Sequence, residues 1–91
     1  MMPTASVEST SLLRWVFQKG PLHITCSIDM VDGGSAFDVS VLPDWNLSAA
    51  TVERFPDAAG AFEHHTELAL ILRTAGWMVA QHSPRHAIAA A

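Results

Sequence analysis

The sequence predicts an α+β domain in which an antiparallel four-stranded meander is followed by one long C-terminal helix packed on the sheet. Three patterns support this prediction. Apolar and polar residues alternate over 22–30, as in a strand with one buried face. The segment Asp32-Gly33-Gly34-Ser35 is typical of a hairpin loop. Apolar residues recur over 58–75 at the spacing of an amphipathic helix.

Length and composition indicate one small domain. The chain has 91 residues, of which 49% are hydrophobic and 15% are charged, so it is apolar enough to fold and too poor in charge for a disordered chain. We expect a disordered leader at 1–10, a single α+β domain at 11–82 and a disordered tail at 83–91, because neither end has a periodic apolar pattern. A domain this small buries only a modest share of its surface, so a partner or a second copy can bury more of it.

The first two strands are predicted from their inward faces. In the first strand these residues are Leu13, Trp15 and Phe17. In the second they are Leu22, Ile24, Cys26, Ile28 and Met30. The two faces coincide when the loop between the strands has an even number of residues. Because Pro21 has no N–H group to close a two-residue loop after Gln18, we expect a four-residue loop from Gln18 to Pro21.

The next two strands are less fully determined. Phe37, Val39 and Val41 form the inner face of the third strand. If Gly33 and Gly34 make the preceding turn, Asp29 faces Asp38, and this pair raises one carboxyl pKa or attracts a cation. A loop built around Asp32 and Gly33 avoids that pairing. A fourth strand is expected over 50–55, where Thr51, Glu53 and Phe55 compete with Val52 and Arg54 for the inner face.

The helix has recognisable signals at both ends. Asp57 can cap its first turn, and Gly76 can adopt the left-handed conformation that ends a helix, with Trp77 meeting Leu72 in a Schellman motif. The inward half of the helix is Ala58, Ala61, Phe62, His65, Leu68, Ala69, Leu72 and Ala75. The sequence does not decide whether the residues that follow, 77–82, form a short fifth strand.

Charge and cysteine content exclude several classes of protein. The formal charge is −4, with five Lys and Arg against nine Asp and Glu, so the chain lacks the overall basic character of a nucleic-acid binder. The one cysteine, Cys26, permits no disulfide within the chain and no cysteine zinc site.

Residues 1–20 show no secretory pattern, and the longest apolar run, 68–72, is far shorter than the roughly 20 residues that span a bilayer. We therefore expect a cytoplasmic protein with no membrane segment.

The sequence contains no residue set with the spacing of a metal or catalytic site. His64 and His65 diverge by about 100° on the predicted helix, and His82 and His86 are separated by a proline. The acidic residues near the hairpin lack the spacing of an EF-hand and are interpreted as solvated turn residues. There is no G-x-S-x-G motif, and a thiol on an inner strand face, as at Cys26, is ordinarily inert. We expect no metal, no cofactor and no enzymatic activity, and interpret His65 as a hydrogen-bonded core histidine.

Trp45 and Leu70 are the tentative interface residues. Trp45 lies in a Pro-Asp-Trp-Asn loop and Leu70 on the polar side of the helix, and neither position has a clear place in the core. Exposed large apolar side chains can mark an interface, although Trp45 can also cap one end of the core. The first hypothesis is therefore a non-enzymatic protein-interaction or self-association module that forms a homo-oligomer or binds a protein partner.

The predicted order of four strands and one helix is similar to that of single-stranded nucleic-acid binders of the Whirly and positive-cofactor-4 type. This resemblance of topology implies dimers with a basic, aromatic-bearing sheet. The matching face here has Arg14 and Arg54 as its cations, beside Thr25, Ser27, Asp29, Asp38 and Ser40. Nucleic-acid binding through Arg14 and Arg54 is the alternative hypothesis. The third is a small-ligand protein or enzyme with a pocket between helix and sheet, where His65 or Cys26 acts.

Overall fold

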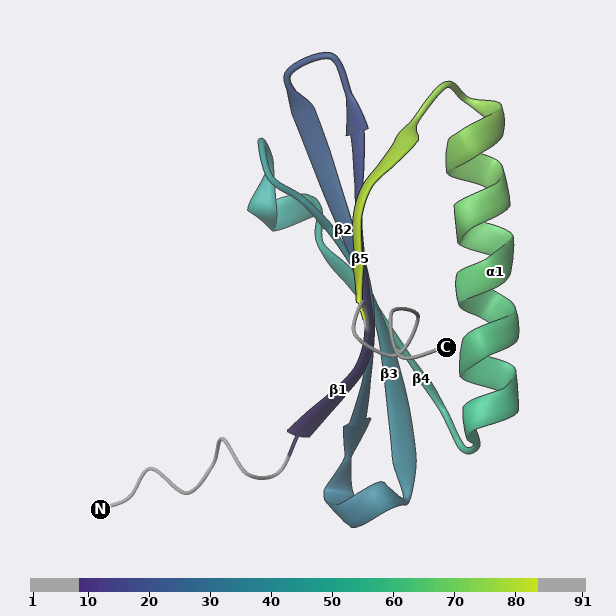
Figure 1. Cartoon of the computed structure of the whole chain (residues 1–91). Helices are drawn as coiled ribbons and strands as arrows, with labels where there is room; N and C mark the ends of the chain where they lie inside the picture. The colour runs from purple at the N-terminus through teal and green to yellow at the C-terminus, as the bar shows by residue number, and fades with distance from the viewer. Residues whose placement is uncertain (1–8, 84–91) are drawn as a thin grey trace.

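One sheet of five strands and one long helix form the two layers of the fold (Figure 1). The structure is a computed structural model that describes residues 9–83. The strands are β1 (Ser9–Lys19), β2 (Leu22–Val31), β3 (Ala36–Pro43), β4 (Thr51–Phe55) and β5 (Met78–Ser83). The helix is α1 (Ala58–Thr74), and two short 3-10 turns are η2 (Asp32–Gly34) and η3 (Leu47–Ala49). The predicted α+β class is confirmed, and the fifth strand that the sequence left open is present.

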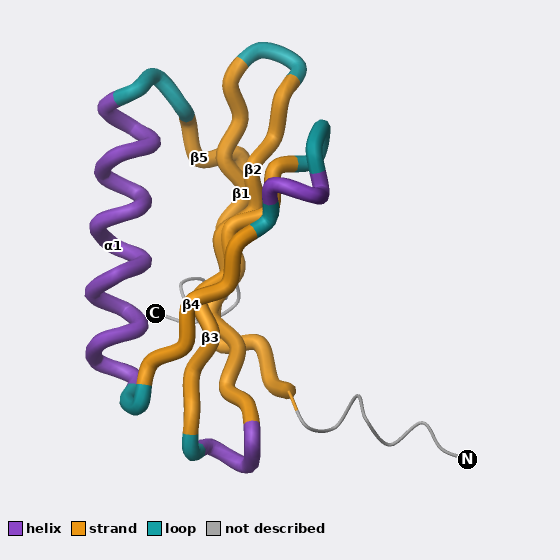
Figure 2. The backbone as a smooth tube through the Cα atoms, turned by 180° about the vertical axis from the view of Figure 1, so that it is seen from behind, coloured by secondary structure: helices purple, strands orange, loops and turns teal. Residues whose placement is uncertain are grey.

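The helix covers one face of the sheet and leaves the other open (Figure 2). The strand order is β4-β3-β2-β1-β5, and every neighbouring pair is antiparallel. Strands β1 to β4 form the predicted meander, after which α1 returns across the sheet and β5 pairs with the free edge of β1. The open face carries Thr25, Ser27 and Ser40, which are partly exposed, as expected of an antiparallel sheet with one face in water.

Strand pairing extends beyond the predicted limits of the domain at both ends. β1 begins at Ser9, opposite Val31, and β5 ends at Ser83, opposite Arg14. These positions lie in the predicted leader and tail, but a strand ladder is made by the backbone and needs no apolar side chain. The remainder of both segments lies outside the described residues.

The first hairpin loop is shorter than predicted. Lys19 pairs with Leu22, so the loop is Gly20 and Pro21 and not the expected four residues that start at Gln18. Gly20 adopts a φ of +60°, which suits a tight turn. Pro21 lies inside the loop, where its missing N–H group is not needed for pairing. The observed two-residue loop and the predicted four-residue loop both have an even number of residues. The inward faces of β1 and β2 are therefore the predicted ones.

The second hairpin brings two carboxylates together. Gly33 and Gly34 lie at the centre of its loop with φ values of 67° and 99°. Of the two registers that the sequence left open, this one places Asp29 opposite Asp38. The ladder between β3 and β4 resolves the faces of β4: Phe55 lies opposite Phe37 on the helix side.

Both helix ends are formed as predicted. The side chain of Asp57 accepts a hydrogen bond of 2.7 Å from the Gly60 N–H group. At the other end Trp77 donates to the Leu72 carbonyl at 3.0 Å, and Gly76, with a φ of +99°, donates to the Arg73 carbonyl at 3.1 Å. These two bonds define the Schellman motif.

The core lies between the helix and the sheet in two clusters. The buried members are Phe17, Ile24, Cys26 and Ala69 in one cluster and Ile28, Val39 and Ala61 in the other. The helix contributes two alanines and the buried His65 to this contact, so its backbone can lie close to the sheet. One large apolar residue of the helix is displaced to the rim: Phe62, which the helical spacing predicted to face the core, is exposed.

Candidate functional site

Trp45 packs against another tryptophan of the same chain. It follows β3, is 50% exposed, and stacks on Trp77 with the ring centroids 5.9 Å apart and 12° between the planes. Trp77 in turn packs against the core cluster that contains Phe17. Trp45 therefore covers one end of the core with one side of its ring and leaves the other side open.

The two arginines of the open sheet face lie beside carboxylates. Arg54 Nε and Nη2 donate to Asp38 Oδ1 and Oδ2 at 2.8 and 3.2 Å, and Arg54 Nη1 donates to Asp32 Oδ2 at 3.2 Å. The Arg54 hydrogen bond holds the pKa of Asp38 below its ordinary value, whereas burial, and then the charge of Asp38, raises the pKa of Asp29. Arg54 is thus the cation of Asp38 and Asp32, whereas the charge of Arg14 acts on Asp29 and opposes the rise of its pKa. Arg14 lies three strands away on β1, or about 14 Å, so these two residues do not form a basic patch.

The acidic neighbours of His64 do not build a metal site. Its Nε2 lies 3.3 Å from Glu53 Oε1 and its Nδ1 lies 3.9 Å from Glu67 Oε1. Both glutamates are largely exposed, and such pairs are weak in water. Within residues 9–83, no three ligating side chains converge as a metal ion would require.

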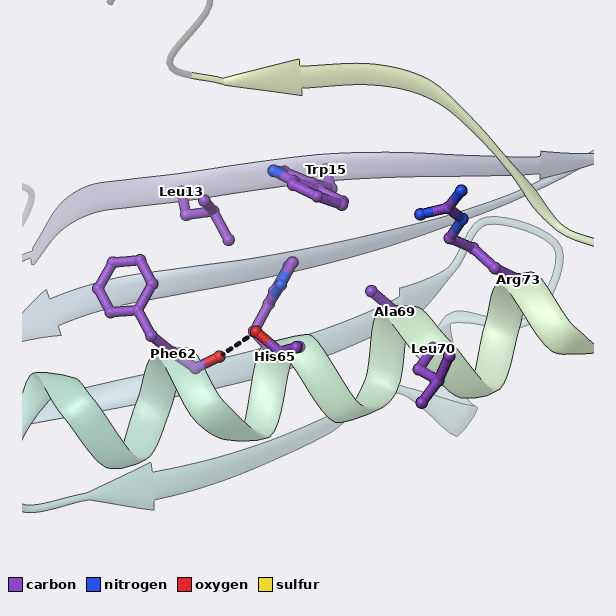
Figure 3. A pocket seen from close by; sticks show the side chains of 8 residues that line it. Leu13, Trp15, Phe62, His65, Ala69, Leu70 and Arg73 are labelled. Carbon is purple, nitrogen blue, oxygen red and sulfur yellow. Dashed lines mark hydrogen bonds between the residues drawn. The ribbon is translucent and has the colours of Figure 1, made fainter.

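A groove of about 430 Å³ lies between α1 and β1 (Figure 3). Its apolar lining consists of Leu13 and Trp15 from β1 and of Phe62, Ala69 and Leu70 from α1. The helix lines the groove with six residues, and after Phe62 they follow at intervals of three, four, seven, eight and eleven, so they lie along one side of the helix: Phe62, His65, Thr66, Ala69, Leu70 and Arg73. Leu70, which is 66% exposed, lines the open side of this groove. The structure therefore places Leu70 in the lining of this groove, away from the Trp45–Trp77 stack.

His65 is the buried polar residue of this groove. It is 4% exposed, and its ring points from the helix toward the sheet, where it meets the Trp15 ring edge-on at 5.2 Å (Figure 3). The backbone of Cys26 on β2 lies beside the imidazole. The ring nitrogen Nε2 is closed to solvent and has no hydrogen-bond partner among the described residues. The burial of His65 agrees with the predicted core histidine, but Nε2 lacks the hydrogen bond that the prediction expected.

Burial controls the charge of both reactive groups near the groove. It lowers the pKa of His65; the Cys26 backbone opposes this shift and the charge of His64 adds to it. The imidazole is thus neutral at neutral pH. Burial also raises the pKa of the Cys26 thiol to about 11, so this cysteine carries no thiolate at neutral pH.

The remaining polar residues lie farther along the helix side of the groove. Thr66 Oγ1 donates to the Phe62 carbonyl at 2.9 Å, so its proton is already engaged. The guanidinium of Arg73 reaches from the helix toward the sheet (Figure 3). It belongs to a residue two helical turns beyond His65, or about 12 Å along the axis.

The sequence contained part of the signal for this site. A histidine inside an apolar stripe, between two alanines on the same helix face, marks a place where the helix lies close to the sheet beside a polar group.

No protein family, curated protein or solved structure matches the chain. Within the described residues, no helix combines the length and apolar character needed to cross a bilayer.

Proposed function

We propose that the protein is a small non-enzymatic binding module that takes an apolar ligand in the groove between α1 and β1. The observation that carries this proposal is the groove itself, which exposes apolar side chains of both walls. Phe62 and Leu70 on the helix wall are 40% and 66% exposed, so a ligand seated between the walls removes apolar surface from water.

The size and lining of the groove support the same conclusion. Its volume of about 430 Å³ lies within the range of about 300–1,000 Å³ that small-molecule pockets occupy. The lining is mainly apolar, with Trp15 and Phe62 as aromatic surfaces and few polar groups. A mainly apolar lining with few polar groups is typical of ligand sites.

Binding is favoured over catalysis by the shortage of reactive groups. His65 is the one imidazole of the groove, and no carboxylate lines it to act as a second acid or base. The nearby Cys26 thiol is packed in the core with a raised pKa. General acid–base and nucleophilic chemistry both need a positioned pair of groups.

The proposal is tested by calorimetric titration of the full chain with 4-pentylphenol, an apolar probe that fits the groove. Leu70→Glu places a charge in the lining, and Ile71→Glu is its matched control, because Ile71 is equally exposed at 64% but does not line the groove. We expect saturable binding that Leu70→Glu weakens by about tenfold or more, while Ile71→Glu changes it by less than about twofold. Absence of binding, or equal effects of both substitutions, would contradict the proposal.

Self-association is a second candidate, favoured by an open strand edge. β5 pairs with β1 from Arg14 to Gln18, so residues 10–13 of β1 have no strand on that side among the described residues. Open edges of this kind can pair across a two-fold axis. Sedimentation equilibrium at several hundred micromolar tests it: a dimer supports this function, and a monomer throughout excludes it.

Cytoplasmic location belongs to the same proposal. A lone, buried Cys26 suits a reducing compartment, where proteins do not depend on disulfides. Cell fractionation tests this: recovery outside the cytoplasm would contradict it.

A further inference from the structure

We infer that the ligand of this groove is an apolar monocarboxylate, whose carboxylate binds the guanidinium of Arg73 while its apolar part lies between α1 and β1. This inference rests on the proposed function and adds the chemical class of the ligand: an amphipathic anion, in contrast to a neutral or cationic apolar molecule.

Arg73 gives the groove its charge. Among the described residues that line it, Arg73 is the one with a permanently charged side chain, and none is acidic. This side chain extends from the last turn of α1 toward the sheet (Figure 3). The groove is therefore cationic, although the chain as a whole has a formal charge of −4.

The described part of the chain gives this guanidinium no carboxylate. None of the ion pairs within residues 9–83 involves Arg73. A partner on the same helix would lie three or four residues away, and none of these positions is acidic: Ala69, Leu70, Gly76 and Trp77. The opposite wall is apolar, with Leu13 and Trp15. A carboxylate for Arg73 is thus left for a ligand to supply.

The charge lies at one end of an otherwise apolar groove. Phe62 lines the groove eleven residues before Arg73, which is about 16 Å along the helix axis. Figure 3 shows Leu13 and Phe62 together at one end, Trp15 in the middle and Arg73 toward the other end. An elongated molecule with an apolar body and one terminal charge matches this arrangement.

A carboxylate is the head group that suits a single arginine. The planar guanidinium can donate two parallel hydrogen bonds to one carboxylate. One cation balances one negative charge, whereas a doubly charged phosphate would keep an unbalanced charge beside apolar surface. Because Arg73 is exposed to solvent, water screens the pair, and we expect it to raise the affinity by about fivefold.

Two probes with the same apolar part test the inference: 4-pentylbenzoate carries the carboxylate, and 4-pentylphenol is neutral. Calorimetric titration of the full chain compares Arg73→Gln with the matched control Arg14→Gln. Arg14 lies opposite Ser27 on the open sheet face, so its substitution removes the same charge away from the groove. We expect Arg73→Gln to weaken benzoate binding by about fivefold. Phenol binding in both variants, and benzoate binding in Arg14→Gln, should change by less than about twofold.

Three results would overturn the inference and leave the proposed function standing. The first is benzoate binding that Arg73→Gln weakens no more than Arg14→Gln does. The second is an equal loss of affinity for both probes in Arg73→Gln, which would indicate packing by the arginine stem. The third is a chain that binds the phenol but not the benzoate. Binding of neither probe would overturn both the inference and the proposed function.

The guanidinium signals of Arg73 provide a second test that needs no variant. The proton and nitrogen shifts of an arginine Nε–H group respond to a bound carboxylate in NMR spectra of mildly acidic solutions. We expect the Arg73 signal to move on addition of 4-pentylbenzoate, while the signals of Arg14 and Arg54 stay in place. Equal shifts of all three, or an Arg73 signal that stays in place at saturation, would overturn the inference.

Discussion

Replacing His65 by leucine is expected to stabilise the fold while it removes the polar atom of the groove. Leucine has a similar volume and no unpaired nitrogen, so the change removes a cost of about 1–3 kcal/mol. It also removes the interaction of the ring with the Cys26 backbone, which contributes no more than a neutral hydrogen bond, about 0.5–1.5 kcal/mol. The net expectation is a gain of about 1 kcal/mol, or a rise in Tm of about 4–8 °C for a domain of this size.

The same substitution should change how stability depends on pH. Because the pKa of His65 is lowered in the folded state, the unfolded chain binds its proton first as the pH falls. Folding stability is therefore lost on acidification from about pH 6.5 down to the lowered pKa, at up to about 1.4 kcal/mol per pH unit. His65→Leu lacks this loss, so its advantage over the unmodified chain should widen in acid.

Urea unfolding, followed by circular dichroism at about pH 8 and about pH 5.5, measures both effects, since these values lie on either side of the ordinary histidine pKa. The other titratable groups, including the neighbouring His64, are common to both proteins and largely cancel in the difference. A His65→Leu protein that is less stable at the higher pH would refute the idea of a costly unpaired Nε2. An advantage that stays the same at both pH values would refute the lowered pKa.

Three further substitutions test the fold around the site. Asp57→Ala removes the 2.7 Å cap bond and should cost about 1 kcal/mol in thermal unfolding, whereas Asp57→Asn should retain most of it. Gly76→Ala forces a side chain to a φ of +99° and places its Cβ 3.4 Å from Lys19 Cε; we expect a loss of about 1–2 kcal/mol in urea unfolding. Arg54→Ala should raise the pKa of Asp38, seen in carboxyl carbon shifts, because the hydrogen bond that lowers this pKa is lost.

Local patterns account for the parts of the fold that were predicted. Alternation over 22–30, the two glycines of the second loop, the Asp57 cap and the Gly76 ending are all properties of neighbouring residues, and each is realised in the structure. The first loop was mispredicted because matching the inward faces fixes only the parity of the register, and the proline argument excluded a loop closed by Pro21 but not one that contains it. β5 could not be predicted because it depends on a free edge of β1, which is a tertiary property.

The groove could be predicted only in part for the same reason. Helical spacing placed Phe62 and His65 on the inward half of the helix. The small side chains of Ala61 and Ala69 determine where the helix touches the sheet, and this contact leaves Phe62 at the rim and His65 at the buried centre. Whether Nε2 finds a partner depends on which atoms of β1 and β2 face it, and sequence spacing carries no information about that.

Intermolecular proton contacts measured by NMR between 4-pentylphenol and the isotope-labelled chain test the central claim most directly, because they locate the ligand. The account predicts contacts to Leu13, Phe62 and Leu70, which line the groove from both of its walls. Contacts confined to Ile71, or to the exposed face of Trp45, would show that the probe adheres to apolar surface elsewhere and would contradict the account.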